Sequence, residues 1–137
     1  MQVSKAAVAA ARENIEANGI TNVFIARMSS EEFVEAWRNK TPKRRLQGLD
    51  WDALCLHTLV VDPPRAGLDE GTERLLCEFD RVLYISCNPD TLHKNLQRVK
   101  NSHKIERFAL FDQFPGTPHI ECGVYLVKRP NVSNDAA

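Results

Sequence analysis

The sequence lacks several features that would fix a functional class at once. No apolar run approaches the roughly 20 residues that a membrane-spanning helix needs, and no charged-then-apolar leader opens the chain, so we expect a cytoplasmic protein. The 18 basic and 18 acidic residues give a formal net charge of zero. Overall charge therefore indicates no nucleic-acid partner, and any grip on a nucleic acid must be local.

Cysteine and glycine are also missing from the patterns in which they usually carry function. Cys55, Cys77, Cys87 and Cys122 form no C-x-x-C pair, which argues against a zinc or iron–sulfur site, and we predict no metal. No glycine-rich turn of the type that binds dinucleotides or adenosyl cofactors joins a strand to a helix. The 137 residues suit one domain or part of one.

Helices and strands are expected to alternate along the chain. Capping residues and apolar periodicity predict helices over residues 4–19, 30–37 and 69–78, and a fourth helix that starts at Asn88 or Asp90. The same patterns predict strands over residues 23–27, 55–61, 81–86, 104–111 and 121–128. The near-continuous apolar run at 55–61 predicts a parallel strand buried on both faces. This alternation predicts an α/β fold with a mostly parallel sheet. The short link over residues 113–119 predicts an antiparallel strand pair at one edge.

Two further segments are assigned from composition. Residues 39–49 contain four basic side chains without periodicity, so we expect a surface loop that contacts either solvent or phosphates. We expect residues 1–129 to form a partial catalytic domain and residues 130–137 to be a disordered tail.

Three residues stand where chemistry is usually placed. Cys87 follows a predicted strand and precedes a predicted helix, whose first amides would favour a nucleophilic thiolate; the alternative is a structural cysteine. Asp62 ends an apolar strand and precedes two prolines, so it either contacts a ligand or caps the loop. Glu121 begins an apolar strand after a Pro/Gly-rich loop, as a base or as a surface glutamate. Arg65 could pair with Asp62 or with a phosphate.

Together these segments resemble a known family. The stretches LVVDPPRAG (59–67), ISCNP (85–89) and HIECGV (119–124) strongly resemble the RNA uracil-5-methyltransferases in order and spacing. RLQGLD (45–50) and ALFDQFP (109–115) look specifically like the bacterial tRNA enzymes, which make the ribothymidine of the T-loop. The resemblance extends to about Lys128 and implies a Rossmann-like methyltransferase fold that uses S-adenosyl-L-methionine.

The resemblance also implies roles for individual residues. Cys87 would add to carbon 6 of the uracil, and Glu121 would remove the proton from carbon 5 after methyl transfer. Asp62 would contact the cofactor, while Arg65, Asn88 and Pro89 would shape the substrate pocket. A flipped base in the tRNA T-loop would be the substrate.

The sequence departs from the family in two places. Gln2 stands where the family has an acidic residue that holds the cofactor ribose. The glycine-rich turn, the first two strands and the N-terminal RNA-binding region have no counterpart. We therefore expect the C-terminal catalytic part of a longer enzyme, weak cofactor binding by the chain alone, and unpaired edges or a non-family pairing at the strands that would flank the missing ones. Two alternatives stay open: a ribosomal RNA methyltransferase, and a non-catalytic interaction module.

Overall fold

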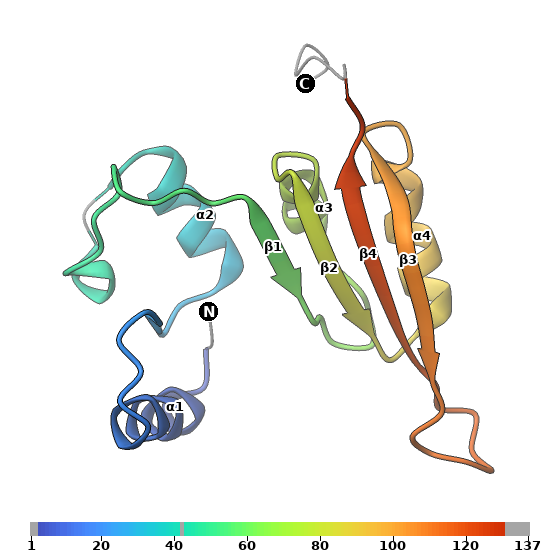
Figure 1. Cartoon of the computed structure of the whole chain (residues 1–137), viewed down its shortest axis with the longest axis horizontal. Helices are drawn as coiled ribbons and strands as arrows, with labels where there is room; N and C mark the ends of the chain where they lie inside the picture. Colours follow the sequence, from blue (N-terminus) through green and yellow to red (C-terminus); the bar gives the residue numbers. More distant parts are fainter. Residues whose placement is uncertain (1–2, 42, 131–137) are drawn as a thin grey trace. The chain divides into compact units, whose positions relative to one another are not determined.

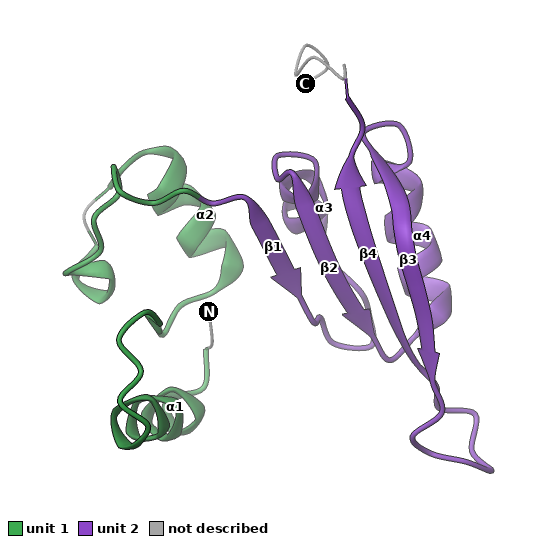
Figure 2. Cartoon of the chain, viewed as in Figure 1, with its two compact units in different colours: residues 1–55 green, residues 56–137 purple. Residues whose placement is uncertain are grey.

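A computed structural model of the chain describes residues 3–41 and 43–130. Gln2 and most of the expected tail, residues 131–137, lie outside the described residues. The chain divides into two compact units, residues 1–55 and residues 56–137 (Figure 2). Unit 1 is helical and unit 2 contains a four-stranded sheet with two helices, which together make the expected mixed α/β fold (Figure 1). No described helix is long and apolar enough to cross a membrane.

Two capped helices organise unit 1. Helix α1, Lys5–Ala17, begins after Ser4, whose side chain accepts a hydrogen bond from the Ala7 amide. Helix α2, Ser30–Arg38, begins with a capping box in which the side chains of Ser29 and Glu32 each bond the other's backbone amide. A short 3-10 helix, η1, covers Arg44–Leu46. Both α-helices were predicted from the sequence.

The strand predicted over residues 23–27 is wrong. Only Arg27 forms an isolated bridge, and no described strand of unit 1 lies beside this segment. β-Branched and aromatic residues favour a strand only where a partner can take up the backbone hydrogen bonds. The segment instead contributes Ala26 to a small core of four buried residues. These are Ala26, Met28, Ala36 and Leu46, flanked by Phe33, Leu49 and Trp51.

The basic loop of unit 1 is largely neutralised by neighbouring carboxylates. Lys40 pairs with Asp52 at 2.6 Å, Lys43 with Glu35 at 3.0 Å, and Arg45 with Glu32 at 3.5 Å. These exposed pairs contribute little stability in water. They favour the prediction of a solvated surface loop over that of a phosphate contact.

The sheet of unit 2 has the strand order β1-β2-β4-β3. Strand β1, Thr58–Val61, pairs in parallel with β2, Arg81–Ser86. Strand β4, Glu121–Lys128, lies antiparallel between β2 and β3, His103–Phe111. The antiparallel pair predicted from the short link is therefore present. The prediction of a mostly parallel sheet is wrong, because only the β1–β2 pair is parallel and β4 runs antiparallel to both of its neighbours. Among the described residues β1 pairs with β2 only, which leaves it at the edge of this sheet.

Helices α3, Glu70–Leu76, and α4, Pro89–Val99, cover one face of this sheet (Figure 1). The strands alternate accordingly: Val82, Tyr84 and Ser86 of β2 are buried, while Arg81, Leu83 and Ile85 are exposed. We call the face opposite α3 and α4 the second face. It carries exposed apolar side chains from several strands, including Val60, Leu83, Ile85 and Phe111.

Two expectations about the strands are corrected by this arrangement. The apolar run at 55–61 forms a strand only over its last four residues, and that strand is not buried on both faces, since Val60 is 60% exposed. Strand β2 is buried on one face only. A sequence run cannot tell a doubly covered strand from an edge strand, because coverage depends on other segments. Cys55, expected inside this strand as a structural residue, is exposed and precedes it.

Candidate active site

The three candidate residues lie at one edge of the sheet of unit 2. Because β1 and β2 are parallel, Asp62 and Cys87 both follow the carboxyl ends of their strands at the same edge. Because β4 runs antiparallel to β2, its first residue, Glu121, lies at that edge as well. Ligand sites of open α/β sheets usually lie outside the carboxyl ends of parallel strands. The fold thus brings together residues far apart in the sequence.

The strand register relates Cys87 to Glu121 more closely. The last pair of the β2–β4 ladder is Ser86 with Cys122, so continuing the register by one residue sets Cys87 opposite Glu121. Directly opposed residues of antiparallel strands have Cα atoms about 4.5–5.5 Å apart and point to the same face. Since Ser86 and Cys122 are buried on the helix face, the alternation assigns Cys87 and Glu121 to the second face. The strand register therefore predicts that a thiol and a carboxylate share one face at this edge.

The side chains of Asp62, Cys87 and Glu121 make no hydrogen bond or ion pair with another described residue. Asp62 is exposed, whereas Cys87 and Glu121 are half-buried. The neighbouring Asp69 and Asn88 are instead used as helix caps, accepting from the Thr72 and Asp90 amides. The uncommitted groups are thus those that the sequence assigns to chemistry, and they remain available to a ligand.

The loop between Asp62 and α3 is held against the start of α4. Its turn is closed by the Gly67 amide, which donates to the Pro64 carbonyl at 2.9 Å. The Arg65 carbonyl accepts from Asn88 Nδ2 at 3.1 Å and from Thr91 Oγ1 at 3.4 Å. Asn88 therefore caps α4 and fixes the loop with the same side chain. Pro89, the first residue of α4, has no amide hydrogen to leave unsatisfied there.

Arg65 contacts a histidine rather than Asp62. Its Nη1 lies 3.2 Å from His119 Nδ1, which joins the loop after β1 to the loop before β4. A guanidinium can only donate, so Nδ1 accepts and the ring carries its hydrogen on Nε2. The ring also meets Phe114 edge-on, with centroids 6.3 Å apart. His119 lies two residues before Glu121, so the contact orders the chain that leads into the carboxylate.

Burial sets the charge state of the cysteine that pairs with Ser86. Burial, and then the nearby Glu121 carboxylate, raise the pKa of the Cys122 thiol, so Cys122 remains a neutral core residue.

A shallow hollow of about 580 Å³ lies elsewhere on the second face, lined by Leu83, Glu106, Arg107, Tyr125 and Val127. It does not include Asp62, Cys87 or Glu121, so we do not assign the chemistry to it.

Sequence reasoning missed the residues that hold the site together. Thr91, Asn95 and His119 contact the loop after β1 through their side chains, and none was chosen as a site residue. Asn88, Thr91 and Asn95 follow one another at helical spacing, a polar stripe that could have been noticed on α4. No group of three or more His, Cys, Asp or Glu side chains able to hold a metal ion occurs in the part of the chain that the structure describes.

Comparisons with known proteins agree with this fold. A solved structure, "The crystal structure of Pyrococcus abyssi tRNA (uracil-54, C5)-methyltransferase in complex with S-adenosyl-L-homocysteine", matches with a TM-score of 0.60 and 28% identity. The match covers 91% of this chain and 27% of that one. The fold is therefore of the Rossmann-like methyltransferase class.

Sequence comparisons define the family within that class. Residues 1–129 match the tRNA (Uracil-5-)-methyltransferase family, and the chain belongs to it. Relatives called tRNA/tmRNA (uracil-C(5))-methyltransferase are 58% identical in Saccharophagus degradans and 53% identical in Shewanella sp. strain ANA-3, each over 128 residues. These matches cover 93% of this chain and 35% of each relative. The chain thus spans about a third of the length of the curated relatives it matches.

Proposed function

We propose that this chain is the catalytic part of an S-adenosyl-L-methionine-dependent enzyme that methylates carbon 5 of a uracil in tRNA. The proposal is carried by the strand register, which, continued by one residue past the Ser86–Cys122 pair, sets Cys87 opposite Glu121 at one sheet edge. Membership of the family and the names of the relatives support the reaction. Those names favour tRNA over the alternative of ribosomal RNA, and we extend the proposal to the T-loop uridine on the sequence resemblance.

Cys87 acts as the nucleophile in this proposal. Carbon 5 of uracil is too weak a nucleophile to accept a methyl group unaided. Addition of the Cys87 thiolate to carbon 6 forms a carbon–sulfur bond and moves the electron pair of the 5,6 double bond onto carbon 5 and the carbonyl, as an enolate. Cys87 immediately precedes Asn88, the N-cap of α4, so the nucleophile lies at the amino end of that helix.

Glu121 acts as the base that ends the reaction. After carbon 5 has been methylated, it still carries the proton that must leave. Removal of this proton by Glu121 returns the electron pair to the 5,6 double bond and expels the Cys87 thiolate. The carboxylate belongs to the strand beside Cys87 and has no side-chain partner of its own among the described residues. In this proposal, one uracil ring bound between the two side chains contacts both Cys87 and Glu121.

The cofactor site is only partly represented in this chain. When bound, S-adenosyl-L-methionine supplies the electrophilic methyl group. The residues present fit one wall of such a site, because Asp62 offers an exposed, unpaired carboxylate at the carboxyl edge of β1 and β2. Arg65, Asn88 and Pro89 surround the same edge and would shape the base pocket. Gln2, which the resemblance assigns to the cofactor ribose, lies outside the described residues.

Trapping with RNA that contains 5-fluorouridine tests the proposal. Fluorine at carbon 5 replaces the proton that Glu121 removes, so an active enzyme stalls as a covalent protein–RNA adduct. We would place this chain in the matching segment of the Saccharophagus degradans relative and expect a stable adduct, with mass spectrometry locating the bond at Cys87. Cys87→Ser should abolish the adduct. Cys55→Ser, at an exposed cysteine of unit 1, is the matched control and should form it normally.

The same chimera separates the alternatives. Methylation of unmodified tRNA but not of ribosomal RNA is the expected result. Methylation of ribosomal RNA alone would replace the substrate in the proposal. A folded chimera that forms no adduct on Cys87, next to an active parent enzyme, would instead favour the non-catalytic interaction module.

A further inference from the structure

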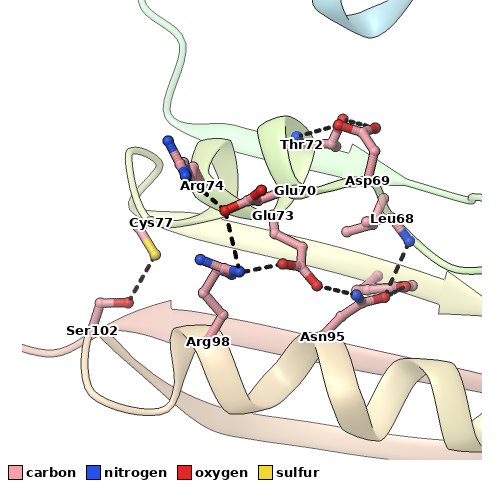
Figure 3. A network of polar contacts seen from close by, with 11 residues as sticks. Leu68, Asp69, Glu70, Thr72, Glu73, Arg74, Cys77, Asn95, Arg98 and Ser102 are labelled. Atoms are coloured by element: carbon pink, nitrogen blue, oxygen red, sulfur yellow. Dashed lines mark hydrogen bonds and ion pairs between the residues drawn. The ribbon is translucent and has the colours of Figure 1, made fainter. Parts of the chain in front are cut away.

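Asn95 lies at the centre of a polar network behind the candidate site. It is 6% exposed, on the face of α4 that packs against the sheet. Its Oδ1 accepts from the Leu68 amide at 3.1 Å and from the Tyr84 hydroxyl at 2.7 Å. Its Nδ2 donates to Glu73 Oε1, and the other carboxylate oxygen of Glu73 accepts from Arg98 Nε at 2.6 Å (Figure 3). One amide therefore joins the loop after β1 to α3, α4 and β2.

The loop lies so close to Asn95 that only glycine fits beside it. Gly67 has a φ of +85°, and a Cβ added there would lie 2.8 Å from Asn95 Oδ1 and 3.1 Å from Thr91 Cβ. Asn88, Thr91 and Asn95 stand at positions i, i+3 and i+7 of one helix face. The first two hold the Arg65 carbonyl and the third holds the Leu68 amide. The loop is thus fixed along α4 at two backbone positions.

Asn95 uses both lone pairs of Oδ1 and one of the two Nδ2 hydrogens. Two donors occupy Oδ1, which has two lone pairs, and Nδ2 faces a carboxylate that cannot donate when ionised. Burial, and then the charge of Glu73, raise the pKa of Tyr84 to about 12, so its hydroxyl keeps the proton that it donates. An apolar side chain in place of Asn95 would leave the half-buried Leu68 amide without this acceptor.

We propose that Asn95 is a positioning residue that fixes the loop carrying Asp62 and Arg65 relative to Cys87. Cys87 lies immediately before the N-cap of α4, and the loop is bonded to the same helix, so α4 sets the distance between them. This inference rests on the proposed function, because it concerns the geometry of the same site. Asn95 itself reaches neither substrate nor cofactor and acts through the loop.

Amide hydrogen exchange in the 137-residue chain tests the structural half of the inference. In the unaltered chain we expect the Leu68 amide to be protected. Asn95→Leu should raise its exchange rate at least tenfold while the amides of the β2–β4 ladder keep theirs. Unchanged Leu68 protection in Asn95→Leu would overturn the proposal, as would an equal loss throughout the ladder, which would indicate general loosening.

Two further variants keep the test specific. Tyr84→Phe removes one donor from Oδ1 and the weaker contact of the Leu68 amide with the Tyr84 hydroxyl, but it leaves the bond from Leu68 to Asn95, so we expect Leu68 exchange within about threefold of the unaltered chain. The double variant Asn95→Asp with Glu73→Gln exchanges amide and carboxylate, keeping an acceptor for Leu68 and a donor between positions 95 and 73. It should restore Leu68 protection. The assignment to Asn95 would fail if Tyr84→Phe raised the hydrogen-exchange rate of the Leu68 amide as much as Asn95→Leu does. It would also fail if the double variant did not restore the protection of that amide.

The functional half uses the chimera described above. Asn95→Leu should lower the rate of adduct formation with 5-fluorouridine RNA about tenfold, and Tyr84→Phe should leave it near the unaltered value. Equal rates in the unaltered chimera and in Asn95→Leu would overturn the positioning role. If exchange at Leu68 responds as expected but the unaltered chimera forms no adduct on Cys87, the proposed function fails while the structural role of Asn95 stands, so the two failures are distinguishable.

Discussion

At the residue scale, the polar side chains near the sheet edge divide into two groups. Asp69 and Asn88 form helix caps, and Asn88 and Asn95 bond the loop after β1. Asp62, Cys87 and Glu121 have no side-chain partner among the described residues. A carboxylate that is half-buried and unpaired contributes nothing to stability that would explain its position. Its position is explained if it serves a ligand.

Replacement of Glu121 by glutamine separates the two chemical steps. Glu121→Gln keeps the size of the side chain but removes the proposed base, so the proposed nucleophile, Cys87, should still add to uracil. In the chimera we expect turnover to fall at least about a hundredfold, the usual contribution of a positioned base. A covalent adduct with ordinary, unfluorinated RNA should accumulate, as seen in denaturing gels. Loss of turnover without any adduct would contradict the role of Glu121 as the base.

Residue types at strand ends allowed the candidate site residues to be predicted from the sequence. The contacts that hold the loops around these residues could not be predicted in this way. Asp62, Cys87 and Glu121 each stand where an apolar strand meets a loop, which is visible in the sequence alone. The contact of Arg65 with His119 joins residues 54 positions apart, and no local pattern indicates it. The partner expected for Arg65 was Asp62 or a phosphate, because charge alone was considered.

At the scale of elements, local sequence signals predicted the helices and strands whose bounds depend on neighbouring residues. The bounds of β2 and β4 were predicted as the structure has them. Helices α1 and α2 follow their serine caps. The failures are the segment 23–27 and the run 55–61, whose pairing and coverage depend on other segments. Propensity cannot supply a partner strand.

The capping box of α2 gives a stability prediction for unit 1. Ser29→Ala removes the acceptor for the Glu32 amide, so the free energy of unfolding should fall by about 1 kcal/mol. Ser29→Asp keeps an acceptor at the N-cap and should lose only a few tenths of that amount. Urea unfolding followed by tryptophan fluorescence measures the change, since Trp37 and Trp51 both belong to unit 1. Equal losses in the two variants would show that the cap contributes little.

His103 gives a pH-dependent prediction for unit 2. It is 2% exposed, and Nε2 lies 2.9 Å from the Phe79 carbonyl, so it joins the start of β3 to the turn before β2. Burial lowers the pKa of His103 below its usual value near 6.5. The folded state therefore binds fewer protons than the unfolded state. The free energy of unfolding should be highest above about pH 6.5 and should fall as the pH drops through the lowered folded-state value.

The slope of that loss identifies the residue. One titrating group contributes at most about 1.4 kcal/mol per pH unit. His103→Gln should flatten the dependence between about pH 7.5 and 5.5, and His93→Gln, at an exposed histidine of α4, should not. Urea unfolding followed by tyrosine absorbance reports on unit 2, which contains both tyrosines, Tyr84 and Tyr125. A slope that survives in His103→Gln would assign it to other groups.

At the scale of the whole molecule, the chain contains the candidate site residues, but its charges do not indicate an RNA-binding surface. The formal net charge is zero, and the basic side chains of the loop in unit 1 are mostly paired with carboxylates. A protein that binds RNA through phosphates needs unpaired cations. The described loop of unit 1 therefore supplies few such cations. The matched relatives are about three times as long as this chain.

The same reasoning predicts how the chain alone treats the cofactor. Adenosyl cofactors are usually bound by a glycine-rich turn between a strand and a helix, whose backbone approaches the ligand closely. This sequence has six glycines and no such turn, so Asp62 would offer only one wall of the site. Calorimetry with S-adenosyl-L-methionine should show a dissociation constant well above the low-micromolar range, and Asp62→Asn should change it little. Low-micromolar binding that Asp62→Asn abolishes would mean that the loop after β1 suffices to hold the cofactor without that turn.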